Sequence, residues 1–216
     1  MTTFQQTALL LTAIWLLLVV IRFSRSTVVL IGGLLGIGLF TLASLFLGAV
    51  TLEELGLEIP DSWLLTIGYG LAGLVLMLAY SPVADRLASR WVKEAPTLGA
   101  FRAIQQSWGA LIIGIVVAWV LGGVLEELVA RGIVLQAVES WLGTWLSRPV
   151  ATILAVCVAA AGAGLMHSYQ GPRAVIIITQ LSILFGVLFV VSGYNLWAVM
   201  ICHGLYDTIA FIKFAR

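Results

Sequence analysis

Long apolar runs recur along the whole chain, and they restrict its fold more than any other feature of the sequence. A helix needs about 17 to 25 mostly apolar residues to cross the roughly 30 Å hydrocarbon core of a bilayer. Such runs occupy residues 6–22, 27–50, 63–82, 108–131, 149–167, 174–192 and 195–213. We therefore predict an all-α protein, a polytopic bundle of about seven transmembrane helices.

The composition agrees with a location in the membrane. Of the 216 residues, 62% are hydrophobic and only 10% are charged. About a quarter of the residues in a soluble domain are charged. Strands are not expected, because the runs lack the alternation of a membrane barrel and an open sheet edge leaves backbone groups unsatisfied in lipid. We expect an integral membrane protein surrounded mainly by the lipid bilayer.

The basic residues outside the apolar runs lie almost entirely on one side of this arrangement. The other side receives only Arg148, together with the acidic loop 51–62. By the positive-inside rule, the amino terminus is predicted to lie outside and the carboxyl terminus in the cytoplasm. The short loops suggest a bacterial plasma membrane. The basic residues on the predicted cytoplasmic side are Arg22, Arg25, Arg86, Arg90, Lys93, Arg102, Arg173, Lys213 and Arg216.

A polar connection at residues 83–107 divides the chain into an amino-terminal part, 1–104, and a carboxyl-terminal part, 105–216, with four predicted spans. The net charge of +1 and the lack of a basic patch give no reason to expect nucleic acid as a partner. Cys157 and Cys202 both lie within predicted spans, so they indicate neither a disulfide framework nor a metal knuckle.

Away from the helix ends, the charged and histidine side chains of the spans all lie in the carboxyl-terminal part. A charged group at the bilayer centre costs about 2.5 to 3.5 kcal/mol, so such residues usually face a bundle interior and indicate function. Both histidines of the chain belong to this set, which consists of Glu126, Glu127, Arg131, His167, His203 and Asp207.

Helical spacing predicts how some of these side chains pair. Glu127 and Arg131 are four residues apart, so they can form an ion pair on one helix face. Glu126 is turned about 100° away, which leaves its carboxyl group without a full partner. A desolvated carboxyl group in that position is suited to act as a general base or acid. His203 and Asp207 are also four residues apart and share one face.

Each of these features also has a purely structural interpretation. Glu127 and Arg131 could only fix helix packing, and His167 could be a histidine at the membrane interface. His203 and Asp207 could make an interhelical hydrogen bond, worth about 0.6 kcal/mol on average. The convergence of all six residues in one low-dielectric region favours catalysis, although ion-pair networks produce similar clusters.

Three short motifs carry these residues: "EELVAR" at 126–131, "AGLMH" at 163–167 and "HGLYD" at 203–207. They resemble the E-E-x-x-x-R, F-x-x-x-H and H-x-x-x-N or D motifs of the CAAX protease and bacteriocin-processing family of intramembrane proteases, which includes the Ras-converting endopeptidases. The resemblance covers about residues 105–212. Two positions depart from it, since Ala163 replaces the usual Phe and Asp207 stands where Asn is common.

The resemblance implies an intramembrane endopeptidase that acts on a membrane-associated protein or peptide, with the four carboxyl-terminal helices as its catalytic core. Glu126 would activate a water molecule, assisted by His167. His203 and Asp207 would stabilise the tetrahedral oxyanion. The carboxyl group of Asp207 can donate to an oxyanion only when protonated, and would otherwise orient His203 or a metal.

The resemblance leaves two possibilities for a cofactor, none or zinc. If a metal is present, His167, His203 and Glu126 are its expected ligands. The chain has no H-E-x-x-H helix, and we favour a glutamate mechanism without metal. Glu127 and Arg131 would then hold the helix of the first carboxyl group in register.

Two alternatives to an enzyme remain open. One is a non-catalytic membrane scaffold or immunity protein of the same fold. The other is a proton-coupled transporter component that uses the buried residues as a relay. The transporter predicts two related halves with interrupted helices, and the sequence shows no such internal symmetry.

The predicted spans contain one geometric conflict. If the fourth helix enters the bilayer at Trp108, Glu126 lies about 27 Å further along and far from His167, at the opposite end of its span. Either this helix begins in the cytoplasm, or the segment after Arg131 returns into the membrane, with bends at Gly132 and Gly143. The small residues around Gly162 and Gly164 predict close helix packing or a cavity near His167.

Overall fold

The computed structural model describes residues 27–216 together with Ala8, Leu10, Thr12 and Trp15. These four residues are helical. The rest of the predicted span 6–22, and the basic residues Arg22 and Arg25, lie outside the described residues. The described part of the chain is helical and contains no strand, which confirms the all-α prediction.

The long helices of the described chain follow the predicted spans closely. Five of them are long and apolar enough to cross a membrane, and a shorter apolar segment, Leu35–Phe46, belongs to the helix of the second predicted span. The fold is therefore a polytopic helical bundle. The α-helices are α2 (Thr27–Phe46), α3 (Trp63–Trp91), α4 (Trp108–Ala118), α5 (Gln136–Leu142), α6 (Arg148–Met166), α7 (Pro172–Val191) and α8 (Leu196–Ala215).

Side-chain caps and prolines fix where several of these helices begin. The side chains of Ser62, Ser107 and Asn195 each accept a hydrogen bond from the backbone N–H three residues ahead, at 3.3, 3.1 and 3.3 Å. This satisfies one of the free donors at the start of α3, α4 and α8. Pro149 and Pro172 lie in the first turn of α6 and α7, where a missing N–H costs nothing.

The fourth predicted span is part of one continuous helical rod, Trp108–Leu142, of 35 residues. It joins α4 and α5 through two π-helical segments, η2 (Trp119–Glu126) and η3 (Leu128–Leu135). At 1.5 Å per residue the rod is about 52 Å long, more than a bilayer core requires. The predicted end at Arg131 is therefore wrong. Gly132 does not interrupt the helix, and only Gly143 terminates it.

The rod also resolves the geometric conflict. Its length allows α4 to begin well beyond the bilayer, so Glu126 can lie level with the end of α6. No re-entrant half-helix follows Arg131 in the described structure, because the chain stays in the same helix as far as Leu142.

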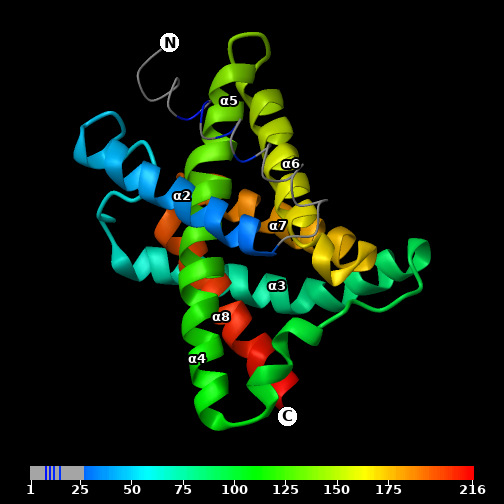
Figure 1. The fold of residues 1–216 in the computed structure, drawn as a ribbon. Coiled ribbons are helices and arrows are strands. Elements are labelled where there is room, and N and C mark those ends of the chain that lie inside the picture. The colour runs from blue at the N-terminus through cyan, green and yellow to red at the C-terminus, as the bar shows by residue number, and fades with distance from the viewer. Residues whose placement is uncertain (1–7, 9, 11, 13–14, 16–26) are drawn as a thin grey trace.

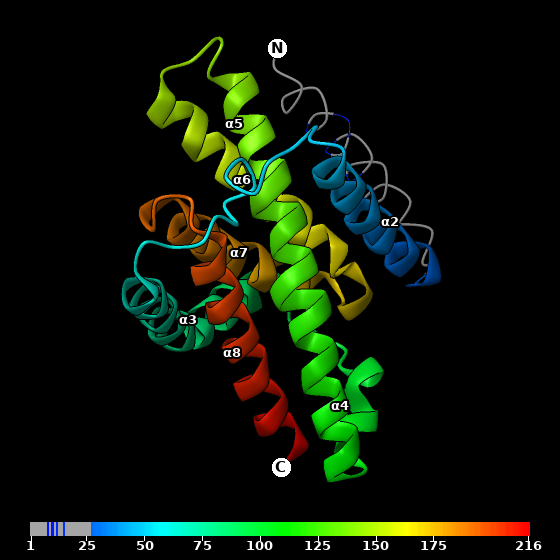
Figure 2. The ribbon, with the colours of Figure 1, turned by 90° about the vertical axis from the view of Figure 1, so that its left-hand side faces the viewer.

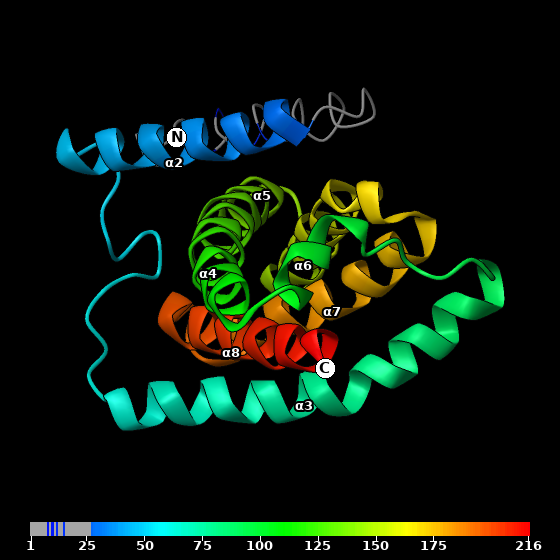
Figure 3. The same cartoon turned by 60° about the horizontal axis from the view of Figure 1, so that its bottom comes forward.

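The predicted connection 83–107 is also more helical than expected. α3 continues to Trp91 and contains Pro82, and Figure 3 shows it bending near its carboxyl-terminal end. After an extended stretch, a short 3₁₀ helix, η1 (Gly99–Gln105), leads to α4.

The rod formed by α4 and α5 runs through the middle of the molecule, with α8 beside its lower half (Figures 1 and 2). In Figure 3, α2 lies along one side and α3 along the opposite side, and the rod, α6, α7 and α8 lie between them. The carboxyl-terminal helices thus form the interior of the bundle. α3 packs against both α7 and α8.

Loops that were predicted to share the outer side do lie together. Gln136 Nε2, at the start of α5, donates to the backbone oxygen of Glu54 at 2.8 Å. The N–H of Leu196 donates to the oxygen of Gly56 at 2.8 Å. The acidic loop 51–62 therefore contacts the first residues of α5 and α8.

The predicted cytoplasmic ends are joined in the same way. Arg173 at the start of α7 makes two hydrogen bonds, 3.0 and 2.8 Å, to the carboxylate of Asp85 near the end of α3. Thr97 N–H donates to Gln170 O at 2.8 Å. The grouping of loops agrees with the predicted topology, while the choice of which side is cytoplasmic rests on the positive-inside rule.

Candidate active site

Two adjacent glutamates at the junction of η2 and η3 have different surroundings. Successive residues of a helix point about 100° apart, so the two side chains diverge. The side chain of Glu127 is fully buried, whereas 29% of the Glu126 side chain is exposed. Of the two glutamates, only Glu126 has side-chain surface that the protein leaves uncovered.

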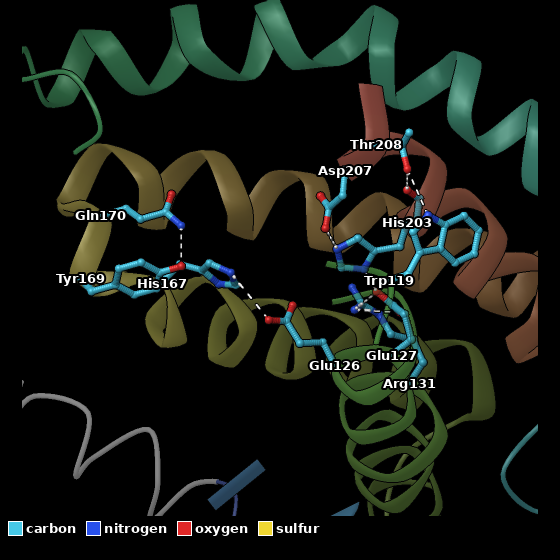
Figure 4. A network of polar contacts seen from close by, with 11 residues as sticks. Trp119, Glu126, Glu127, Arg131, His167, Tyr169, Gln170, His203, Asp207 and Thr208 are labelled. Carbon is cyan, nitrogen blue, oxygen red and sulfur yellow. Dashed lines mark hydrogen bonds and ion pairs between the residues drawn. The ribbon is translucent and has the colours of Figure 1, made fainter. Parts of the chain in front are cut away.

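Glu126 faces His167 at the end of α6 (Figure 4). Its Oε1 lies 3.8 Å from His167 Nε2, too far for a direct hydrogen bond. On the other side of the ring, His167 Nδ1 lies 2.9 Å from the backbone oxygen of Ala163. A carbonyl oxygen only accepts, so Nδ1 carries the proton and a neutral His167 presents the lone pair of Nε2 toward Glu126.

A small cavity lies at this pair. It offers about 20 Å³, which is room for roughly one water molecule. The side chains of Glu126 and His167 and the small residue Ala163 border it. The lining residues are Trp15, Glu126, Val129, Ala130, Arg131, Ala163, Met166 and His167.

Ala163 is the position at which the second motif departs from the family pattern. Its contribution to the His167 contact comes from the backbone oxygen, which any residue would supply. The departure therefore leaves the orientation of His167 intact and instead enlarges the space beside it.

Glu127 connects two elements that sequence spacing did not link. It pairs with Arg131 at 3.0 Å, as predicted from the four-residue spacing. Its Oε1 also lies 2.6 Å from Nδ1 of His203 on α8. Since this carboxylate accepts from the guanidinium group of Arg131, it also acts as the acceptor here, and Nδ1 of His203 is the donor. Nε2 of His203 faces Asp207 Oδ2 at 3.5 Å, which confirms the proximity expected from their spacing.

The six predicted side chains thus meet in one region at the centre of the bundle (Figure 4). Asp207 interacts electrostatically with Glu126 and His167 as well as with Glu127 and its neighbour His203. Carboxylates and imidazoles from the rod, α6 and α8 therefore share one low-dielectric site.

Close helix packing holds these elements together, and part of it was not anticipated. A Cβ atom on Gly122 would lie 2.9 Å from Asp207 Oδ2 and 3.3 Å from His203 Nε2. A Cβ on Gly204 would collide with the ring of Trp119, whose Nε1 donates to Thr208 Oγ1 at 3.0 Å. The adjacent glycines Gly122 and Gly123 in an apolar helix were the sequence signal for this contact, because small residues allow helices to approach closely.

Gly162 and Gly164, which were predicted to allow close helix packing, lie at such contacts. A Cβ on Gly164 would collide with Thr179 and approach the oxygen of Val175 at 2.8 Å, so α6 and α7 touch there. A Cβ on Gly162 would collide with Trp15. Trp15, which also borders the small cavity, brings the amino-terminal part of the chain to the site. The sequence motifs did not indicate this residue.

The same residues were tested as a zinc site. Among the residues that the structure describes, no group of three or more His, Cys, Asp or Glu side chains could hold a metal ion. His203 Nδ1 is occupied by Glu127, and His167 Nδ1 by a backbone oxygen. These contacts leave Nε2 of each ring as the nitrogen that a metal could bind. Nε2 of His167 faces Glu126 whereas Nε2 of His203 faces Asp207, so His167, His203 and Glu126 are not gathered as one ligand set in the described residues.

The fold and the site together define an integral membrane protein whose ionisable residues meet inside a helical bundle. Residues 108–209, which contain all six site residues, match the family described as "Rce1-like: Type II CAAX prenyl endopeptidase Rce1-like". This part of the chain is similar to that CAAX protease family, as its motifs suggested. The matched segment falls within the predicted carboxyl-terminal part, 105–216. Searches of curated proteins and of solved structures found no match.

Proposed function

We propose that this protein is an intramembrane endopeptidase that hydrolyses a peptide bond of a membrane-associated protein or peptide. The observation that carries the proposal is the cavity for about one water between Glu126 and His167. Hydrolysis needs a water held against a general base, and this cavity offers a carboxylate and an imidazole lone pair to the same molecule.

In the proposed reaction, Glu126 takes a proton from the water while Nε2 of His167 accepts its second hydrogen bond. The water oxygen then forms a bond to the carbonyl carbon of the substrate, whose oxygen becomes an oxyanion. Glu126 returns the proton to the amide nitrogen as the carbon–nitrogen bond breaks. Both groups therefore act on one side of the scissile bond.

His203 is the proposed oxyanion donor. Its Nδ1–H stays on Glu127, so a protonated ring can offer Nε2–H to the oxyanion. Asp207 faces this nitrogen at 3.5 Å. A carboxylate only accepts hydrogen bonds, and we therefore assign Asp207 to orienting Nε2 rather than to binding the oxyanion itself.

We propose that the reaction requires no metal. The basis is that Glu126 and His167 can activate water without one, and that no group of three or more His, Cys, Asp or Glu side chains among the described residues could hold a metal ion. A scaffold or immunity protein of the same fold is the competing proposal, and the same assay separates the two.

The test is cleavage of a panel of membrane-proximal peptides, including a prenylated CAAX peptide, by the purified protein. Glu126→Gln should lower cleavage by about 10²- to 10⁴-fold, since it removes the base but keeps the shape. Glu58→Gln, in the exposed outer loop, is the matched control and should cleave normally. A strong chelator should leave the rate unchanged.

Each other outcome changes the assignment. Loss of wild-type cleavage with chelator would replace the metal-free mechanism with a metal site. Full activity of Glu126→Gln would remove Glu126 from its role. No cleavage of any peptide by the wild type, with the fold intact, would favour the scaffold.

A further inference from the structure

α7 carries none of the three motifs, yet it contacts the site directly through Ser182. Nη2 of Arg131 donates to the backbone oxygen of Ser182 at 2.7 Å and to its Oγ at 2.5 Å. Ser182 is buried, with 4% of its surface exposed. Charged hydrogen bonds in such surroundings are strong, so this contact fixes the guanidinium group.

The fixed guanidinium group transmits its position to His203. Nη1 of Arg131 holds the carboxylate of Glu127 at 3.0 Å. That carboxylate accepts from Nδ1 of His203 at 2.6 Å. A chain of hydrogen bonds through Arg131 and Glu127 therefore leads from Ser182 on α7 to the imidazole on α8.

Phe185, one turn further along α7, controls the same imidazole by packing. Its ring stacks on His203 with centroids 4.7 Å apart and planes inclined by 23°. The guanidinium carbon of Arg131 lies 5.3 Å from the centroid of the Phe185 ring. The Phe185 ring thus contacts both the His203 imidazole and the guanidinium group of Arg131, which holds Glu127. The stacking restricts the plane of His203, while the hydrogen bond to Glu127 sets which nitrogen faces Asp207.

Other residues of α7 serve to hold the helix in the bundle. Thr179 packs against Gly164, and Gly186 against Val156 of α6. Phe189 is fully buried and meets Tyr194 edge to face at 5.3 Å. Contacts other than those of Ser182 and Phe185 therefore also hold α7 in the bundle.

We propose that Ser182 and Phe185 are positioning residues for His203: together they hold its Nδ1 on Glu127 and its Nε2 toward Asp207. The inference rests on the proposed function for the role of His203 in the reaction. The geometry that it concerns can be measured without a substrate.

The experiment uses the fact that the chain has only two histidines, His167 and His203. Purified, tag-free protein labelled with ¹⁵N and ¹³C in histidine gives one set of imidazole signals for each, and a His203→Gln variant assigns them. Ser182→Ala and Phe185→Leu should both shift the His203 signals. The His167 signals should keep their positions, which also shows that the fold is intact.

Matched controls lie on α7 and at its carboxyl-terminal cap. Phe189→Leu makes the same change at a fully buried ring, and Ser192→Ala removes a hydroxyl that bonds to the backbone oxygen of Phe189. Neither should move the His203 signals. The proposal is overturned if Ser182→Ala and Phe185→Leu leave the His203 signals at their wild-type positions, or if the controls move them equally.

A kinetic measurement applies once a cleaved peptide is known. Ser182→Ala should lower kcat by about 10- to 100-fold with little change in KM, because a misplaced group costs rate rather than binding. Ser182→Thr keeps the hydroxyl and should restore most of the rate. If the wild type cleaves no peptide, the proposed function fails, and the NMR comparison alone decides the positioning role.

Discussion

Glu126 and Glu127 show how much the surroundings of a residue decide its role. They are neighbours in a helix and identical in chemistry. Glu127 is surrounded by Arg131 and His203 and has no access to solvent, whereas Glu126 borders a small cavity opposite His167. In the proposed reaction, the first holds its helix in place and the second exchanges protons with water.

This difference predicts unequal losses of stability when each glutamate is replaced. Glu127→Gln leaves the buried Arg131 without its counter-ion, and we expect it to lower the free energy of unfolding by about 3 kcal/mol. Glu126→Gln should lower it by less than about 1 kcal/mol, because Glu126 is partly exposed and makes only a long contact. Denaturant unfolding in detergent, followed by helical circular dichroism, measures both. Equal losses in the two variants would contradict the assignment.

At the scale of elements, close approach of the rod and α8 shapes the site. Gly122 and Gly123 lie on this contact, but they differ in what a methyl group would meet. At Gly122 it would press on the Asp207 carboxylate at 2.9 Å, whereas at Gly123 it would make ordinary contacts of 3.4 Å and more.

Gly122→Ala should therefore reduce peptide cleavage at least tenfold, while Gly123→Ala should leave it within a factor of two or so. Both variants gain the same intrinsic helix preference of about 0.8–1 kcal/mol, so that term cancels in the comparison. Initial rates on one cleaved peptide, with thermal unfolding as a control for folding, measure the effect. Equal rates in the two variants would show that the Gly122 contact does not shape the site.

The turn between α7 and α8 links them to α5 through Tyr194. Its hydroxyl donates to both oxygens of Glu139, at 2.7 and 2.9 Å. Burial and, next, Glu139 raise the pKa of Tyr194 above its ordinary value of 10.0. This turn lies outside the membrane-spanning helices.

A group whose pKa is raised by folding stabilises the folded state below its unfolded pKa and loses that contribution as the pH rises through the folded value. The stability advantage of wild type over Tyr194→Phe should therefore be constant up to about pH 10 and shrink above it. The unfolding free energy of both proteins, measured between pH 7 and 11 or so, gives this difference. A constant difference over the whole range would show that Tyr194 does not contribute to alkaline unfolding.

For the whole molecule, the grouping of loops supports a two-sided arrangement, and the basic residues predict its direction. A single cysteine introduced at Glu58 should react with an impermeant maleimide in intact cells. A cysteine introduced at Arg216 should react only after permeabilisation, since the carboxyl terminus is predicted to be cytoplasmic. The reverse pattern would invert the topology while leaving the fold unchanged.

The membrane class, the presence of the five described spans and the set of six ionisable residues that meet in the bundle could be predicted from the sequence. Apolar length and charge scarcity are properties of the chain itself, because lipid forces each span to satisfy its own backbone groups. The pairs Glu127–Arg131 and His203–Asp207 follow from helical spacing in the same way. The three motifs predicted the family that residues 108–209 match.

Only the tertiary structure decided which groups meet across helices. Sequence spacing could not place His203 on Glu127, Glu126 opposite His167, or Ser182 and Phe185 at the site. The sequence also predicted that the fourth span ends at Arg131, because a polar residue in an apolar run resembles a helix end. Contacts within one helix depend on a local repeat, whereas contacts between helices depend on how glycines such as Gly122 and Gly204 let whole helices cross.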